Sequence, residues 1–110
     1  MNKTKPQIII LTYDANPIAL KEVIAGIEEE GVLWDVEEVQ EYKNLWDLAT
    51  EASRKSSLEV GIGIYKDEAA VQCRELIGRE PLFKTDDAYR LMGSNAGRYV
   101  KRNPFIFEDR

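Results

Sequence analysis

The sequence contains no histidine, and this absence excludes several large classes of enzyme. Without an imidazole there is no Ser-His-Asp or Cys-His nucleophile, no histidine general base and no histidine metal ligand. Cysteine is nearly absent as well: Cys73 is the single one, so neither an internal disulfide nor a tetrahedral zinc site can form within the chain. Such sparse cysteine is typical of a reducing compartment, and we expect Cys73 to be a small packed side chain in a strand.

Long hydrophobic runs are also missing. The apolar stretch near the N-terminus, MNKTKPQIIILTYD, is too short for a signal peptide, and no stretch is long enough to span a bilayer. We therefore expect a cytoplasmic protein without membrane contact.

A glycine-rich phosphate loop is a third absence. Gly61-Ile62-Gly63 lies inside an expected strand, and Lys66 stands where a dinucleotide-binding fingerprint needs its third glycine. These two glycines instead predict the close approach of another backbone to the strand.

The chain has an excess of acidic residues, and they are unevenly distributed. Of 110 residues, 20 are acidic and 15 are basic, which gives a net charge of −5. Between Glu28 and Glu41 there are seven acidic residues and no basic one. A stripe of this sign argues against nucleic-acid binding, which needs a basic footprint, and suits a cation or a basic protein surface. The alternative is a solvated face that keeps the protein in solution.

The N-terminal half of the chain alternates between strand and helix patterns. The apolar run at 7–13 predicts a strand buried on both faces. After a turn at 14–17, apolar residues recur at helical spacing until Gly31 ends the helix. A strand over 32–39 follows, and Asn44 then caps a second helix, whose inner face is formed by Leu45, Leu48, Ala49 and Ala52.

The C-terminal half begins with a hairpin. Alternation over 58–65, a turn at 66–67 and a return over 68–74 predict two antiparallel strands. A short edge strand at 81–83 and a last helix follow. We expect Thr85 to cap this helix, with Asp86 and Asp87 in its first turn. The order predicts one α/β domain over residues 1–110, with helices on both faces of a mainly parallel sheet of about five strands that contains one antiparallel strand.

Three further features have open alternatives. Gly93 and Gly97 lie four residues apart on one helix face and either pack against the sheet or form a groove for a partner. Trp34 and Trp46 are expected to be at least half buried, and would be interface anchors if exposed. The apolar segment 105–107, Phe-Ile-Phe, either folds back on the core or docks on a partner.

The segment Gly26-Ile27-Glu28-Glu29-Glu30-Gly31 breaks an electrostatic rule. A helix C-terminus carries partial negative charge and favours basic residues, yet three carboxylates stand here. Such conflicts are frequent at functional sites, and a cation or a basic partner surface would relieve this one. Because successive helical residues differ by about 100°, the three side chains cannot all bind one ion. One or two carboxylates would form only part of a Mg²⁺ or Ca²⁺ site.

Three segments together resemble the small subunit of the diol/glycerol dehydratase reactivase. They are EVIAGIEEEGVLWDV (22–36), SSLEVGIGIYKDEAAVQCRELIGREPLF (56–83) and LMGSNAGRYVKRNPF (91–105). The combination of G-I-E-E-E-G with the later G-S-N-A-G-R-Y-V-K is the specific part, whereas residues 37–55 match poorly.

The resemblance implies a fold and a role. The fold is a three-layer α/β/α domain with a mixed sheet. The role is a non-catalytic subunit of a chaperone-like reactivase, which partners a large Hsp70-like ATPase subunit in a heterotetramer and has no cofactor of its own. With ATP or ADP on the large subunit, the complex would act on inactivated adenosylcobalamin-dependent dehydratase. The small subunit would trade places with the dehydratase medium subunit so that damaged cobalamin leaves. Association with a bacterial microcompartment is open.

The same resemblance implies a role for one glutamate. In the family, the middle glutamate of the triple completes a divalent-metal site, Mg²⁺ or Ca²⁺, on the large subunit, and by motif position this is Glu29. Glu28 and Glu30 are then interface candidates. The competing hypotheses are a small doubly wound cobalamin- or nucleotide-binding domain and a homologue of the dehydratase medium subunit itself.

Overall fold

The isoleucine-rich run near the N-terminus forms strand β1 (Gln7–Tyr13), which is buried except at its two ends. The structure is a computed structural model that describes residues 5–76 and 80–107. The elements that follow are α1 (Pro17–Glu29), β2 (Leu33–Glu38), α2 (Leu45–Lys55), β3 (Val60–Tyr65), β4 (Glu68–Cys73), a 3-10 turn (Arg74–Leu76), β5 (Phe83–Thr85) and α3 (Tyr89–Lys101).

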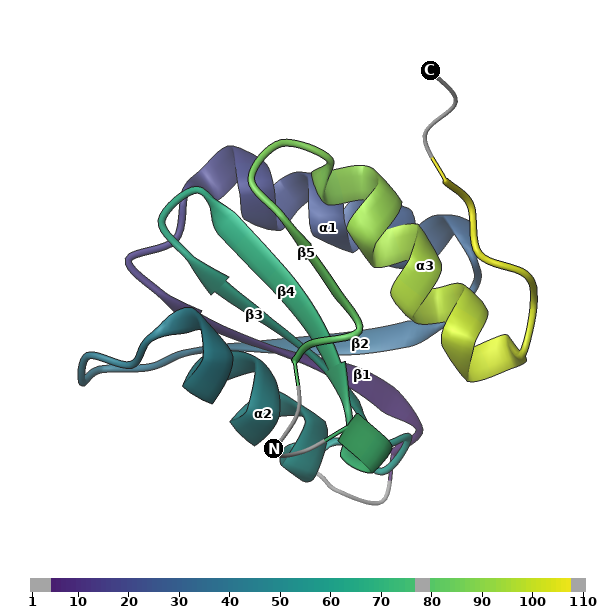
Figure 1. Cartoon of the computed structure of the whole chain (residues 1–110), viewed down its shortest axis with the longest axis horizontal. Coiled ribbons are helices and arrows are strands. Elements are labelled where there is room, and N and C mark those ends of the chain that lie inside the picture. Colours follow the sequence, from purple (N-terminus) through teal and green to yellow (C-terminus); the bar gives the residue numbers. More distant parts are fainter. Residues whose placement is uncertain (1–4, 77–79, 108–110) are drawn as a thin grey trace.

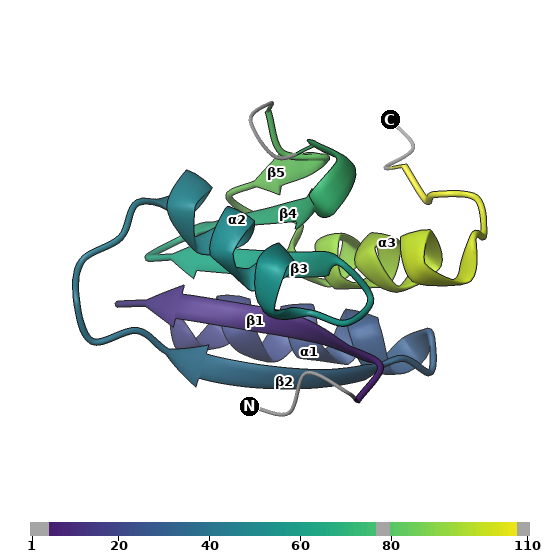
Figure 2. The same ribbon diagram turned by 90° about the horizontal axis from the view of Figure 1, so that it is seen from below.

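The five strands form one sheet in the order β2-β1-β3-β4-β5. Strand β1 is parallel to both β2 and β3, whereas β4 is antiparallel to both β3 and β5. One strand therefore runs against the other four. Helices α1 and α3 cover one face of the sheet and α2 covers the other (Figures 1 and 2). The predicted three-layer α/β/α architecture with one antiparallel strand is confirmed.

The alternating side chains of β1 belong to two cores. Ile8 and Ile10 pack with α1 and α3, and Ile9 and Leu11 pack on the opposite face with α2.

Helix α2 can lie close to the sheet because the facing positions of β3 are Gly61 and Gly63. A Cβ added at Gly63 would lie 2.7 Å from the Leu48 Cβ, and one added at Gly61 would overlap the backbone at Ala52. The predicted close approach at these two glycines is confirmed.

The last helix begins later than its sequence pattern suggests. Thr85 ends β5 and is not the helix cap: its Oγ1 accepts hydrogen bonds from the amides of Asp87 (3.3 Å) and Ala88 (2.9 Å). Asp86 and Asp87 thus lie in a turn before α3, so their predicted place in its first turn is wrong. The hydroxyl stabilises that turn in the same way that it would have capped a helix. Strand β5 is also two residues later than expected.

The apolar C-terminal segment folds back on the core. The carboxamide of the buried Asn95 accepts from the Ile106 amide and donates to the Ile106 carbonyl, both at 2.7 Å. Phe105 packs edge-on against Phe83, with ring centroids 4.9 Å apart, while Phe107 is 70% exposed. Both tryptophans are more than half buried, as expected. Within the described residues, no helix combines the length and the apolar content needed to cross a bilayer.

Candidate functional site

The candidate site is the C-terminal end of α1, where the three glutamates stand. Helix α1 begins at Pro17 after Asn16, whose side chain accepts a hydrogen bond from the Ile18 amide (2.9 Å). It ends in a Schellman arrangement: the Gly31 amide donates to the Glu28 carbonyl and the Val32 amide to the Ile27 carbonyl. Gly31 has a φ of 72°, which glycine adopts without steric cost. The end of the helix is therefore fixed next to the glutamates.

The three carboxylates point to three different partners. Glu28 accepts a hydrogen bond from the Trp34 indole (3.2 Å). Glu29 lies 3.4 Å from both Arg90 and Ser94 on α3. The Glu30 side chain is only 11% exposed and forms an ion pair with Arg98 on α3, at 3.2 Å. The expectation from helical geometry, that the three cannot bind one ion together, agrees with this arrangement.

Basic residues of α3 relieve the electrostatic conflict. Helices α1 and α3 run parallel, because Val23 faces Gly93 and Glu30, later on α1, faces Gly97, later on α3. Their C-terminal ends therefore lie together. Lys101 donates to the Glu30 carbonyl (2.8 Å), one of the exposed backbone acceptors at the end of α1. The compensation that we expected from a cation or a partner surface is thus supplied at least in part within the chain. The sequence of α1 alone gave no sign of these bases, because they lie far away along the chain: Lys101 and Glu30 are 71 residues apart.

A signal for these bases does exist in the sequence of α3. Arg90, Arg98 and Lys101 recur near helical spacing on the side that also presents Gly93 and Gly97. A helix face that combines glycines with bases predicts close contact with an acidic helix. Pairing it with α1 would have placed bases beside the glutamates before the structure was known.

The stripe of small residues on α3 is filled by α1. A Cβ added at Gly93 would overlap the carbonyl of Val23, and one added at Gly97 would lie 2.8 Å from the Glu30 Cβ. Gly26 on α1 faces α3 just as closely, with the Ser94 amide 2.6 Å from its added Cβ. The glycines therefore serve the contact between the two helices. Gly93 and Gly97 pack against helix α1. The alternative that they pack against the sheet is therefore wrong.

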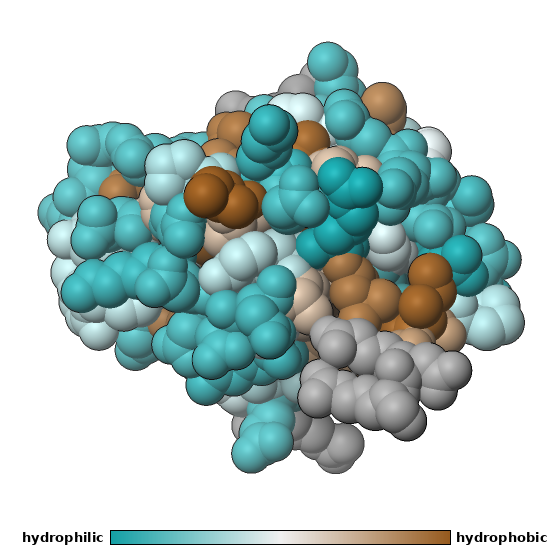
Figure 3. Space-filling view, turned by 90° about the horizontal axis from the view of Figure 1, so that it is seen from above, coloured by the Kyte–Doolittle hydropathy of each residue, from teal (hydrophilic) through white to brown (hydrophobic). Residues whose placement is uncertain are grey.

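Glu29 is more available than Glu30, whose side chain is only 11% exposed. The Glu29 side chain is 52% exposed, and its two contacts at 3.4 Å are long for charged hydrogen bonds. Arg90 is held more firmly by Glu22, with two contacts at 3.3 Å. The face that carries α1 and α3 is mainly hydrophilic, with hydrophobic side chains in a few small areas (Figure 3).

Glu29 fits a divalent cation as one ligand only. Its carboxylate oxygens are the donors that Mg²⁺ and Ca²⁺ prefer. In the part of the chain that the structure describes, no group of three or more acidic or cysteine side chains could hold a metal. Further ligands would have to come from a second molecule or from water.

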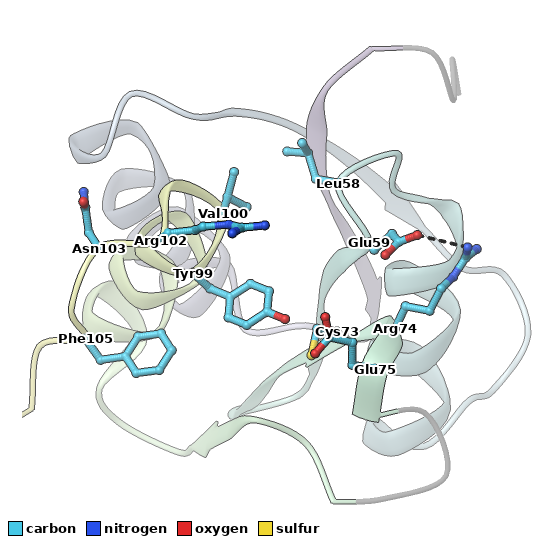
Figure 4. A pocket seen from close by; sticks show the side chains of 10 residues that line it. All are labelled: Leu58, Glu59, Cys73, Arg74, Glu75, Tyr99, Val100, Arg102, Asn103 and Phe105. Atoms are coloured by element: carbon cyan, nitrogen blue, oxygen red, sulfur yellow. Dashed lines mark hydrogen bonds and ion pairs between the residues drawn. The ribbon is translucent and has the colours of Figure 1, made fainter.

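A separate cavity of about 570 Å³ lies where the end of β4 meets the end of α3. In Figure 4 the Tyr99 hydroxyl points across it toward Cys73, with Arg102 on one side and Glu59 on the other. Glu59 forms an ion pair with Arg74 at 3.1 Å. Because acidic and basic side chains balance in its wall, the cavity has no evident preference for a charged ligand. Cys73 itself is buried at the end of β4, as expected.

Tyr99, which lines this cavity, has a clearly altered acidity. A hydrogen bond with the Cys73 side chain, burial, and the nearby charges of Glu75 and Glu59 raise its pKa to about 12. Tyr99 therefore keeps its proton at a higher pH than an ordinary tyrosine does, and its hydroxyl remains a hydrogen-bond donor in the wall of the cavity.

Comparison with known proteins covers nearly the whole chain. The family model described as the dehydratase medium subunit matches residues 5–106. The diol dehydratase-reactivating factor small subunit of Klebsiella michiganensis is 34% identical over 109 residues, which cover 94% of this chain and 86% of that protein. The propanediol dehydratase-reactivating factor small subunit of Salmonella typhimurium is 33% identical, with 94% of this chain and 93% of that protein covered.

Solved structures agree with these sequence relatives. A chain in the structure of diol dehydratase-reactivating factor complexed with ADP and Mg²⁺ superposes with a TM-score of 0.85 at 33% identity, covering 94% of this chain and 100% of that one. A chain of glycerol dehydratase reactivase gives a TM-score of 0.81 at 32% identity, covering 93% and 98%.

Proposed function

Because this chain belongs to the dehydratase medium subunit family, and within it to the small subunits of dehydratase-reactivating factors, we propose that it is the non-catalytic subunit of a diol or glycerol dehydratase reactivase. The observation that carries the proposal is the end-to-end match: the chain covers all of the solved reactivase chain and nearly all of the curated small subunits. A large Hsp70-like partner subunit would bind ATP or ADP and hydrolyse ATP, and two chains of each kind would form a heterotetramer. One of the solved relatives is a complex with ADP and Mg²⁺, which supports the binding of a nucleotide by the assembled reactivase.

The shared family suggests how such a subunit would act on the dehydratase. A family model that describes a dehydratase medium subunit matches this chain over residues 5–106. Membership of the same family would suit this chain to the place of the medium subunit. We propose that it does so in an inactivated dehydratase, and that damaged cobalamin leaves during the exchange.

Glu29 is the proposed contact with the large subunit. Its exposure and its two long contacts leave the carboxylate free to turn toward a partner, whereas Glu30 is held by Arg98. Glu29 would complete a Mg²⁺ or Ca²⁺ site whose other ligands the large subunit provides. Glu28, which is exposed beside it, would lie in the same interface, and Glu30 would contribute by fixing Arg98.

The test is assembly of the Glu29→Gln variant. The change removes the charge but keeps the size of the side chain, and it leaves the folded chain nearly unaffected because surface ion pairs contribute only about 0–1 kcal/mol. We expect co-expression with the large subunit to give a weaker complex with less bound divalent metal, measured by size-exclusion chromatography and elemental analysis.

The matched control is Glu68→Gln. Glu68 also forms an exposed ion pair, with Lys84, but it starts β4 at the opposite end of the sheet. It should assemble like the wild type. Equal assembly and equal metal content of the Glu29→Gln and wild-type complexes would contradict the role of Glu29. No co-elution of the wild-type chain with the large subunit would contradict the proposed function itself.

Activity in a reconstituted dehydratase tests the second hypothesis. A medium-subunit homologue in the narrow sense would restore diol or glycerol turnover when mixed with the other dehydratase subunits. We expect no turnover from such a mixture, and recovery of activity only when inactivated dehydratase meets the complete reactivase with ATP.

A further inference from the structure

Three tyrosines form a cluster at the carboxyl ends of the parallel strands. Tyr13 ends β1, Tyr65 ends β3, and the two are paired in register, with stacked rings 6.1 Å apart. Tyr42, from the loop between β2 and α2, packs edge-on against both, at 5.6 and 5.8 Å. In spite of these contacts Tyr42 is 62% exposed. Tyr13 and Tyr65 therefore support one side of the Tyr42 ring, and the rest of that ring faces solvent.

The place of the cluster in the topology is unusual. Strand β1 lies between β2 and β3 in the sheet. Helix α1 connects β1 to β2 over one face of the sheet, and α2 connects β2 to β3 over the other face (Figure 2). Folds of this kind leave a crevice at such a point, which commonly holds a small ligand. Here the stacked rings of Tyr13 and Tyr65 occupy that position. The presence of two rings at this position counts against the hypothesis of a nucleotide-binding domain.

Backbone strain occurs on both sides of the cluster. Asp14 directly follows Tyr13 and has a φ of 50°, and Lys66 directly follows Tyr65 and has a φ of 52°. Left-handed conformations are unfavourable for these residue types relative to glycine, and they concentrate at functional positions. They fix the direction in which the chain leaves the two stacked rings.

The charge around Tyr42 is predominantly negative. Glu41 precedes it, Glu38 ends β2, and Asp14 follows β1; the side chains of these three have no ion pair in the described part of the chain. Of the nearby bases, Lys43 is bound to Glu51 at 3.2 Å, and Lys66 lies over the Tyr65 ring at 5.4 Å. An exposed tyrosine ring at an end of the sheet where three acids form no ion pair favours an arginine or lysine side chain, which stacks on the ring and is attracted by the acids.

The cluster and Glu29 lie at opposite ends of the molecule. Helix α1 starts beside the carboxyl end of β1 and returns along the sheet, so that Glu29 stands near the start of β2. Resting on the proposed function, in which the Glu29 end binds the large subunit, we propose that Tyr42 and the acids around it dock the dehydratase, through an arginine or lysine of that enzyme. The small subunit would then contact its two partners with separate surfaces.

The experiment measures binding of purified, inactivated diol dehydratase to the full chain in complex with its large subunit. Tyr42→Ala should weaken this binding about tenfold or more, as expected for an aromatic hot spot. Tyr42→Phe keeps the ring and should stay within about threefold of the wild type. Glu41→Lys reverses a charge without removing packing, and should weaken binding and reduce its dependence on salt. The matched control is Phe107→Ala, which removes a comparably exposed ring elsewhere.

Several outcomes would overturn the proposal. Wild-type affinity in both Tyr42→Ala and Glu41→Lys would do so, as would an equal loss in Phe107→Ala, which would indicate non-specific stickiness. Weaker binding to the large subunit, with dehydratase binding unchanged, would assign the surface to the other partner. If the wild-type chain bound neither protein, the proposed function would fail first. Wild-type binding to both that does not respond to Tyr42 or Glu41 would refute this inference alone.

Discussion

At the scale of the residue, Tyr99 shows how neighbours change acidity. Its neutral form is the protonated one, and the hydrogen bond with Cys73, burial and nearby acids all favour that form. Between pH 10 and about pH 12 the folded chain therefore holds a proton that the unfolded chain has released. The free energy of unfolding contains a contribution that is complete below pH 10 and is lost as the pH rises through about 12.

We predict that Tyr99 titrates separately from the other tyrosines. The difference in tyrosinate absorbance between the wild type and Tyr99→Phe should have a midpoint near pH 12. Cys73→Ala should move this midpoint down, because it removes the hydrogen bond. A midpoint at the ordinary value near 10, or no response to Cys73→Ala, would show that the hydroxyl does not interact with Cys73.

In the candidate site, the directions of the three adjacent glutamates could be predicted from the sequence, but their partners could not. Their divergence follows from the helical repeat and could be predicted from the sequence. Their partners could not, because Trp34 lies on β2 and Arg98 lies on α3, and only the tertiary structure brings them together. The sequence therefore predicted that the C-terminal end of α1 is unusual, and the resemblance to the reactivase family implied Glu29. The availability of Glu29 relative to Glu30 emerged only from the contacts.

At the scale of the element, the contact between α1 and α3 depends on glycine. Gly26 and Gly93 bring the two backbones so close that a methyl group on either would overlap a carbonyl of the other helix. A backbone carbonyl held in a helix cannot turn aside as a flexible side chain can. This close contact also places the bases of α3 beside the end of α1.

We predict that Gly93→Ala destabilises the chain even though alanine favours helices. Alanine gains roughly 1 kcal/mol of helix propensity, and the overlap with Val23 costs about 1–3 kcal/mol or more, so the net free energy of unfolding should fall. Chemical denaturation of the isolated chain measures it. The control is Gly31→Ala, where no atom lies within 4 Å of the added Cβ and only the left-handed φ of 72° opposes the change. That cost should be about 1–2 kcal/mol. A more stable Gly93→Ala chain would mean that the helices can move apart freely.

Most element boundaries could be predicted from the sequence, because the strands are strongly patterned and both Asn16 and Asn44 are ordinary caps. The start of α3 could not. Thr85 followed by two aspartates has the composition of a helix start, yet its hydroxyl bonds within a turn and Ala88 takes the cap position without a side-chain hydrogen bond. A helix start and a turn compete there for the backbone amides that donate to the Thr85 hydroxyl. Because Thr85 ends β5, the turn is favoured.

At the scale of the whole molecule, the two ends of the sheet differ in chemistry. The end with Glu29 offers one exposed carboxylate beside a second that Arg98 holds, and the end with Tyr42 offers one exposed ring in a segment with acids that form no ion pair among the described residues. A small chain with different surfaces at its two ends is suited to connect two larger proteins. Tyr42 and Glu29 are both exposed, whereas Tyr13 and Tyr65 pack against the core that faces α2.

We predict that divalent metal stabilises the assembly and not the isolated chain. A single carboxylate such as Glu29 provides at most two of the six or more oxygens that Mg²⁺ or Ca²⁺ requires, so binding to the lone chain should be weak. EDTA should leave the melting temperature of the isolated chain unchanged and should weaken its complex with the large subunit. In the Glu29→Gln complex the effect of EDTA should be much smaller, because the shared ligand is already missing. If millimolar-range Ca²⁺, on the order of the weakest protein sites, raised the melting temperature of the isolated chain, the metal would be bound by this subunit alone.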